Sequence, residues 1–413
     1  MALFRPTMVR KCSGQQMIEL DLYSTLVVAS MVLILGQLLV ARISVIRKYS
    51  IPEPVVGGLV VALILFALHS LSGTSVRFDN SLSRPLMLAF FASIGLNADL
   101  GSLRRGGRPL AIFLIVVAGL LILQNGVGIT LAKLLGLDPL VGLLAGSITL
   151  SGGHGTGAAW SAVLAEQYGL KSATEIALAC ATFGLILGGV IGGPVAQFLI
   201  RKSSASVPRH DTELGVFEEP ASVRRITAPA MVETLALMSA CLLVGQHLSE
   251  KLQGSFLELP AFVCVLFVGV ILRNVLSALG WYTVFERCVS VLGNVSLSLF
   301  LAMALMSLRF WELSALALPM VLLLAAQTAT MALYAIFVTY NVMGRNYDAA
   351  VIAAGHCGFG LGATPTAIAN MQAVTNQFGP SPLAFLVVPM VGAFFIDITN
   401  AIVIKVFLTL VTG

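Results

Sequence analysis

Two glycine-rich stretches within apolar sequence carry the polar groups whose types and spacing could do chemistry. The first reads SGGHGTGAAW at 151–160, and the second reads GHCGFGLGATPTA at 355–367. Glycine weakens a helix, and a broken helix in a bilayer exposes N–H and C=O groups that need protein or a water-filled cavity around them. In secondary transporters, such breaks lie near the midplane, where helix N-termini face anions and free carbonyls coordinate Na⁺. The two stretches therefore predict a binding site for a solute, with no catalytic residues.

The candidate ligands are backbone amides and hydroxyls in both stretches. We expect a substrate to contact Ser151, Gly152, Gly153, His154, Gly155, Thr156, Gly360, Gly362, Thr364 and Thr366. A simple hairpin turn or close helix packing would explain a single glycine-rich break equally well. Two breaks at corresponding positions favour the binding interpretation. For His154 and His356, a structural role and a ligand role both stay open, and neither has further ligands at metal-binding spacing.

Asp397 lies deep in the last apolar segment, 388-VPMVGAFFIDITNAIVIK-405. An unpaired carboxylate there costs at least about 2.5 kcal/mol, so it requires Na⁺, a proton or a substrate ammonium, unless it is paired structurally. Asn400 follows on the same helical face. Asn97 and Asn294 occupy the third apolar segment of each half, where helix–helix hydrogen bonding is the alternative. We expect Asp397, Asn400, Asn97 and Asn294 to meet a cation or an ammonium group; for Gln327 we favour a bond between helices.

Composition shows which elements must position these residues. The chain has 413 residues, of which 58% are hydrophobic and 10% charged, and its mean hydropathy is +0.96. These values predict a polytopic α-helical membrane protein. The net charge of +5 is a topology signal rather than a nucleic-acid footprint. The sequence lacks a P-loop, HExxH and GxSxG, so it predicts neither an ATP-driven pump nor an enzyme. Its six cysteines have no ligand spacing and are interpreted as packing residues.

The apolar segments divide the chain into two similar halves. We predict an N-terminal tail at 1–21, a first repeat at 22–202, a polar cytoplasmic linker at 203–228 and a second repeat at 229–411. Each repeat holds five segments that could cross a bilayer and one pair of shorter segments, at about 139–168 and 347–377. The members of each pair fall short of the roughly 20 residues that spanning requires, which indicates a re-entrant helical hairpin. Pro54 and Pro260 open corresponding segments, as expected for an internal duplication.

Five crossings are an odd number, so the second repeat must be inverted relative to the first. The positive-inside rule supports this topology, because most loop Lys and Arg residues fall on the predicted cytoplasmic side. Both termini are then periplasmic, and Lys405 belongs to the outer end of the last span. The first hairpin enters the membrane from outside and the second from the cytoplasm.

Longer stretches resemble the bacterial sodium/glutamate symporter family from about Met17 to the C-terminus. These are 52-PEPVVGG-58, 85-PLMLAFFASIGLNA-98, 138-DPLVGLLAGSITLSGGHGTGAAW-160, 292-LGNVSLSLFLAMALM-306, 355-GHCGFGLGATPTAIANMQAV-374 and 386-LVVPMVGAFFIDITNA-401. The resemblance implies Na⁺-coupled uptake of L-glutamate across the bacterial inner membrane. It also implies inverted five-span repeats, each with a re-entrant loop, in an elevator-type homodimer with a scaffold and a moving core. Na⁺ is then the coupling ion, and no organic cofactor is expected.

The residues alone leave other functions open. Asp397 and the histidines could carry protons, so an H⁺-coupled carrier, or a carrier of another organic anion or amino acid, remains an alternative with the same fold. Opposed re-entrant loops also build channel filters. A membrane enzyme or sensor would require a catalytic constellation or a folded soluble domain, and the longest polar segment is a short linker.

Overall fold

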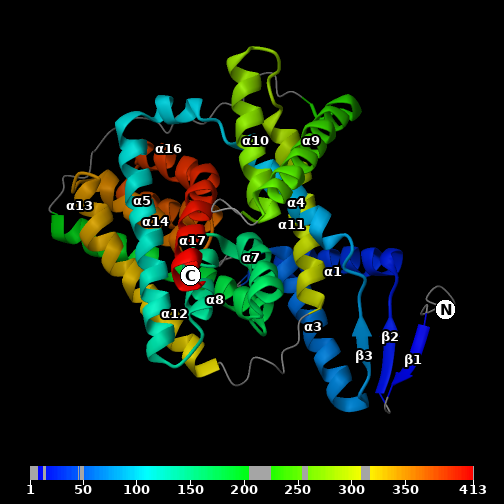
Figure 1. Cartoon of the computed structure of the whole chain (residues 1–413). Coiled ribbons are helices and arrows are strands. Elements are labelled where there is room, and N and C mark those ends of the chain that lie inside the picture. Colours follow the sequence, from blue (N-terminus) through cyan, green and yellow to red (C-terminus); the bar gives the residue numbers. More distant parts are fainter. Residues whose placement is uncertain are drawn as a thin grey trace.

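The computed structural model describes residues 8–12, 15–44, 46, 51–203, 225–253, 259–307 and 317–412, which are mostly helical (Figure 1). The first half contains α1 (Leu22–Arg42), α3 (Glu53–Ser72), α4 (Ser83–Asn97), α5 (Gly101–Leu134), α6 (Pro139–Leu143), the π-helical turn η1 (Leu144–Ile148), α7 (Gly153–Tyr168) and α8 (Ala173–Ser203). The second half contains α9 (Ala228–Leu252), α10 (Ala261–Ala278), α11 (Glu286–Met306), α12 (Ala317–Tyr334), η4 (Ala335–Thr339), α13 (Tyr340–Val342), α14 (Tyr347–Leu361), α15 (Thr364–Phe378), α16 (Pro382–Met390), η5 (Val391–Phe395) and α17 (Ile396–Thr412). Among the described residues, eight helices are long and apolar enough to cross a membrane, which confirms a multi-pass protein.

A small sheet at the N-terminal tail, which the sequence did not predict, accompanies the predicted all-α fold. Strand β1 (Met8–Cys12) pairs antiparallel with β2 (Gln15–Glu19), and β2 pairs in parallel with β3 (Ser75–Arg77). Gly73 ends α3 in the left-handed region, at a φ of 66°, and returns the chain so that β3 can receive the tail. Strands of three to five residues change the average hydropathy very little, so the composition argument could not reveal them.

Helix packing separates the long helices into two groups (Figure 1). We call the first group the scaffold: α1, α3, α4, α9, α10 and α11 pack against one another. We call the second group the core: it contains α5–α8, α12 and α14–α17. Very close contacts hold the scaffold together, because a Cβ atom at Gly36 or Gly57 would overlap the backbone of the other helix where α1 crosses α3.

Each predicted pair of short segments forms two short helices with a break between them. In the first pair, α6 and η1 lead to a turn at residues 149–152, and α7 follows; in the second pair, only Gly362 and Ala363 separate α14 from α15. The predicted breaks were too long, because His154–Gly157 already belong to α7 and residues 355–361 belong to α14. Tertiary packing overrides glycine's low helix propensity here. A Cβ atom at Gly358, for example, would lie 2.5 Å from the backbone of Ala367.

Candidate functional site

The two helix breaks, one from each half of the chain, meet inside the core. The Ser151 Oγ atom lies 3.1 Å from the carbonyl oxygen of Gly360 and 2.7 Å from Oε1 of Gln124 on α5. The Nε2 group of Gln124 donates to the same Gly360 carbonyl at 2.7 Å. All of these bonds are buried, so Gln124 holds the first break against the end of α14. The structure thus brings Ser151 and Gly360 together, as a shared site requires.

The tips of the two breaks also face each other. Gly153 has a φ of 67°, which favours glycine, and a Cβ atom built there would lie 3.5 Å from the Gly362 carbonyl oxygen. Gly155, in the first turn of α7, lies against the scaffold, because a Cβ atom there would be 2.7 Å from Phe90 of α4 and 3.1 Å from Leu297 of α11. The paired tips therefore lie where the core contacts the scaffold.

Asp397 lies beside the first tip. It is half-buried in the first turn of α17, and its carboxylate lies close to the side chain of Thr156. Thr156 is itself in the first turn of α7, where the helix dipole places positive partial charge. This arrangement joins a carboxylate, a hydroxyl and a helix N-terminus. Such a set can hold a cation or an ammonium group next to an anion.

Asn400 contacts the backbone of the first break rather than a side chain of it. Its Nδ2 group donates to the carbonyl of Ser147 at 2.9 Å, and the Ser147 amide donates to Oδ1 of Asn125 at 2.9 Å. Gly146, just before Ser147, has a non-helical backbone (φ −96°, ψ −135°). Within the described part of the chain, Oδ1 of Asn400 and Oγ of Ser147 are buried without hydrogen-bond partners. Unpaired buried acceptors are costly, so these two oxygens are candidate ligands beside the first break.

His154 has a structural partner. Its Nε2 atom lies 3.0 Å from Oγ1 of Thr182 on α8, and that hydroxyl donates its proton to the Leu178 carbonyl at 2.8 Å. The ring therefore ties α7 to α8.

His356 and the threonines of the second break have different surroundings. His356 is fully buried, with Nδ1 2.9 Å from Oγ1 of Thr339 and its ring packed against aromatic side chains. Thr364 donates to the Gly392 carbonyl at 2.7 Å, so its hydroxyl is used. Within the described residues, Oγ1 of Thr366 is buried and has no partner, so this hydroxyl remains available to a ligand.

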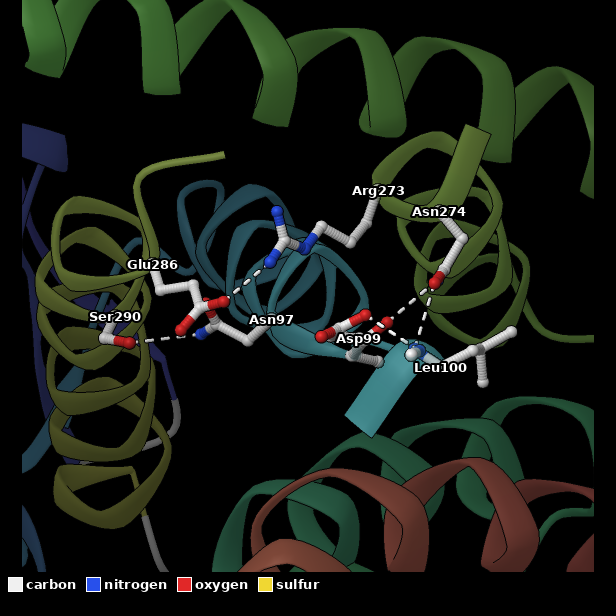
Figure 2. Close-up of polar contacts among 9 residues, drawn as sticks. Asn97, Asp99, Leu100, Arg273, Asn274, Glu286 and Ser290 are labelled. Carbon is white, nitrogen blue, oxygen red and sulfur yellow. Dashed lines mark hydrogen bonds and ion pairs between the residues drawn. The ribbon is translucent and has the colours of Figure 1, made fainter. Parts of the chain in front are cut away.

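The structure does not bring Asn97 and Asn294 to the breaks. Asn97 ends α4 and donates to Oγ of Ser290 at 3.1 Å; Figure 2 shows it beside the ion pair of Arg273 and Glu286, which is 2.6 Å long. Asn294 is exposed on α11. Membrane depth alone could not distinguish the end of a scaffold helix from the centre of the core.

Asn274 on α10 grips the loop between α4 and α5, which joins the scaffold to the core (Figure 2). Its Oδ1 atom accepts from the Leu100 amide at 2.9 Å, and its Nδ2 group donates to the Ala98 carbonyl at 2.9 Å. The Asn274 side chain thus pairs the Leu100 amide and the Ala98 carbonyl, two backbone groups of the loop that follows α4. Asn274 was not predicted as a functional residue; the signal for it was an Arg-Asn pair inside the apolar segment 271-ILRNVL-276.

Further polar residues of the site come from α5 and the first hairpin. Gln124, Asn125 and Ser147 hold the breaks through buried hydrogen bonds. The predicted bond of Gln327 between helices is confirmed, because its Nε2 group donates to the Gln124 carbonyl of α5 at 2.7 Å. These contacts join residues far apart in the chain, so no local pattern could reveal them.

A cavity of about 590 Å³ lies between scaffold and core. Its walls come from α4, α10 and α11 on one side and from α7, α8 and α17 on the other. The cavity follows α7 as far as Ala158, two residues beyond Thr156, but it does not include Ser151 or Asp397. It is therefore positioned as a vestibule that leads toward the paired tips.

Comparison with known proteins adds a family to this geometry. The profile of the family described as "Sodium/glutamate symporter" matches residues 18–380. The chain is 64% identical over 396 residues to the "Sodium/glutamate symporter" of Escherichia coli (strain K12), which covers 95% of this chain and 99% of that protein. It is 55% identical to that of Haemophilus influenzae, over 93% of this chain and 96% of that protein. Among solved structures, the sodium proton antiporter MjNhaP1 of Methanocaldococcus jannaschii matches 95% of this chain and 98% of its own, with 14% identity and a TM-score of 0.41; a likeness this weak supports no conclusion.

Proposed function

Because the chain belongs to the sodium/glutamate symporter family, we infer that it carries L-glutamate across a membrane together with Na⁺. It is a membrane transporter and not an enzyme. The observation that carries this conclusion is 64% identity over almost the full length of both proteins. The meeting of two helix breaks beside a half-buried carboxylate is the geometry that such a transporter needs.

We propose that the protein consists of two inverted five-span repeats, each with a re-entrant hairpin, and works as an elevator. Both halves hold the same order of spans and one pair of short helices, which supports the duplication. The division of the helices into scaffold and core supports a core that slides against a fixed scaffold. α4 and α11 pack with the scaffold, which extends it beyond the first two spans of each half.

The substrate carboxylates would bind at two helix N-termini. α7 begins at Gly153, whose own amide bonds to the Thr149 carbonyl, and α15 begins at Thr364; each start follows a break and directs the positive end of a helix dipole at the site. Thr366 would supply a hydroxyl close to the start of α15, whereas Ser151 would hold the two breaks together through its bonds to Gln124 and Gly360. Asp397 would meet the substrate ammonium or a Na⁺ across from Thr156. His154 and Thr364 would shape the site through the partners described above, and Gly152 and Gly155 would give the backbone close access.

Na⁺ would bind beside the first break, between Asn400 and Ser147. Na⁺ takes oxygen ligands, and Oδ1 of Asn400 and Oγ of Ser147 are buried without hydrogen-bond partners. We expect Ser147→Ala to raise the Na⁺ concentration for half-maximal glutamate uptake about tenfold, equivalent to roughly 1.4 kcal/mol of lost binding. Uptake into proteoliposomes at graded Na⁺ measures this effect. Ser161→Ala is the matched control, because Ser161 is also a buried serine of this hairpin, but it lies on α7 and its hydroxyl bonds to the Ala158 carbonyl. An unchanged Na⁺ requirement in Ser147→Ala would place the ion elsewhere.

The charge pattern and the vestibule support one orientation in the bacterial inner membrane. Most residues that line the vestibule, such as Arg84, Tyr168 and Gln253, lie near helix ends that the positive-inside pattern assigns to the periplasm, so the structure would represent an outward-facing state. Both termini would then be periplasmic. Exposed apolar residues on α1 and α9, such as Met31 and Val232, would contact membrane lipid or a second copy in a homodimer.

The deciding experiment is uptake of radiolabelled glutamate into proteoliposomes with an imposed Na⁺ or H⁺ gradient. Accumulation above the outside concentration that depends on inward Na⁺ is the expected result. Accumulation driven by H⁺ alone would make the protein a proton-coupled carrier, and equilibration without accumulation would indicate a channel. Competition by unlabelled aspartate and glutamine defines the range of substrates.

A further inference from the structure

The vestibule between scaffold and core carries charges of both signs that the binding site at the tips does not use. Lys405 lines it from α17 and Arg84 lines it from α4, so a cation stands on each side. Glu166 of α7 and Glu175 of α8 line the same space. Glutamate carries two carboxylates and one ammonium group, and walls with both signs complement such a zwitterion.

Lys405 is the least expected of these residues. It lies in an apolar helix, eight residues beyond Asp397, which corresponds to roughly 12 Å along α17. The side chain is half-buried, and it takes part in none of the ion pairs found among the described residues. An ammonium group at the outer end of an apolar span is stabilised by water or by an anionic partner. The vestibule supplies the water, and the substrate supplies the anion.

Arg84 gives the vestibule a second cation on the other body. It is exposed near the start of α4, a scaffold helix, whereas Lys405 belongs to the core. The vestibule volume of about 590 Å³ falls within the usual range of 300–1,000 Å³ for ligand pockets, so an amino acid with its water fits inside. A carboxylate in this space meets positive charge on two sides before it reaches Thr156.

We propose that Lys405, with Arg84 opposite, forms an outer carboxylate-binding subsite that captures the substrate before it reaches the hairpin tips. This proposal rests on the proposed function. Fixed charge in a cleft raises the local concentration of an oppositely charged ligand and its rate of association, and added salt weakens the effect. The subsite therefore acts on capture, and the transport step itself stays with the tips and Asp397.

The test is the kinetics of Na⁺-driven glutamate uptake by Lys405→Met in proteoliposomes. We expect the KM for glutamate to rise about tenfold while the maximal rate stays within about twofold of the unsubstituted protein, since only capture is weakened. Lys405→Arg should restore most of the affinity. Lys133→Met is the matched control, because Lys133 is an exposed lysine at the end of α5 that does not line the vestibule.

Ionic strength provides a second readout that does not depend on any substitution. At constant Na⁺, added choline chloride should raise the KM of the unsubstituted protein and change that of Lys405→Met much less. Arg84→Met should show the same loss of salt dependence. This variant keeps the test possible if Lys405→Met does not fold. An unchanged KM with unchanged salt dependence in both variants would overturn the subsite. Failure of the unsubstituted protein to accumulate glutamate would instead overturn the proposed function.

Discussion

Asp397→Asn is expected to abolish Na⁺-driven accumulation of glutamate in proteoliposomes, with a loss of at least about a hundredfold. The carboxylate faces Thr156 at the start of α7, beside the paired tips, and a neutral amide cannot balance an ammonium group or Na⁺ there. Binding of a charged group without its counter-charge costs several kcal/mol, which is enough to remove uptake over the accessible concentration range. Radiolabelled uptake at saturating Na⁺ measures the effect.

Asp138→Asn is the matched control for this substitution. Asp138 caps α6 by accepting the Leu140 amide at 2.8 Å, and asparagine caps helices equally well, so the control should transport normally. Normal uptake with unchanged Na⁺ dependence in Asp397→Asn would remove Asp397 from the mechanism. Restored transport of a glutamate analogue without an ammonium group would assign Asp397 to the substrate rather than to the ion.

Gln124→Leu should lower uptake by at least about tenfold and lower thermal stability at the same time. The substitution removes both bonds that hold Ser151 and Gly360 to α5, and each buried polar group left without a partner costs about 1–3 kcal/mol. Uptake reports the loss of site geometry, and a thermal melt of the purified protein in detergent reports the loss of stability.

Two further variants test whether the effect of Gln124→Leu comes from the lost hydrogen bonds or from the loss of any polar side chain. Gln124→Glu keeps an acceptor for Ser151 but has no amide donor for Gly360, so it should fall between the unsubstituted protein and Gln124→Leu. Gln197→Leu removes an exposed hydrogen bond of 3.4 Å to Gln377, and it should change neither uptake nor thermal stability. Full uptake and unchanged melting in Gln124→Leu would show that the two breaks do not depend on this bridge.

Much of the fold could be predicted because spanning length and apolar composition are local properties. The limits of α1, α8 and α9 and the position of both short helix pairs agree with the apolar segments to within a few residues. The lengths of the breaks were wrong because glycine lowers helix propensity only by about 1 kcal/mol, which packing against neighbouring helices offsets. The N-terminal sheet was missed because β3 lies far along the chain from β1 and β2.

The candidate site was predicted as far as its residues belong to one stretch of sequence. The glycines and Ser151 follow from the breaks, and Asp397 follows from the cost of an isolated charge in an apolar helix. Partners across the chain do not follow, because nothing local links Gln124 to Gly360 or Asn400 to Ser147. Asn97 was grouped with the site by depth alone, whereas its bond to Ser290 places it within the scaffold.

The grip of Asn274 on the loop after α4 bears on how far the core could travel. Leu100 is held to the scaffold at one end, Pro109 starts the straight part of α5 at the other, and Gly107 between them has a φ of 62° that breaks the helix. Residues 101–108 would then act as a tether with one end fixed. Fully stretched, such a tether reaches roughly 27 Å, which sets an upper bound on the stroke at this corner of the molecule.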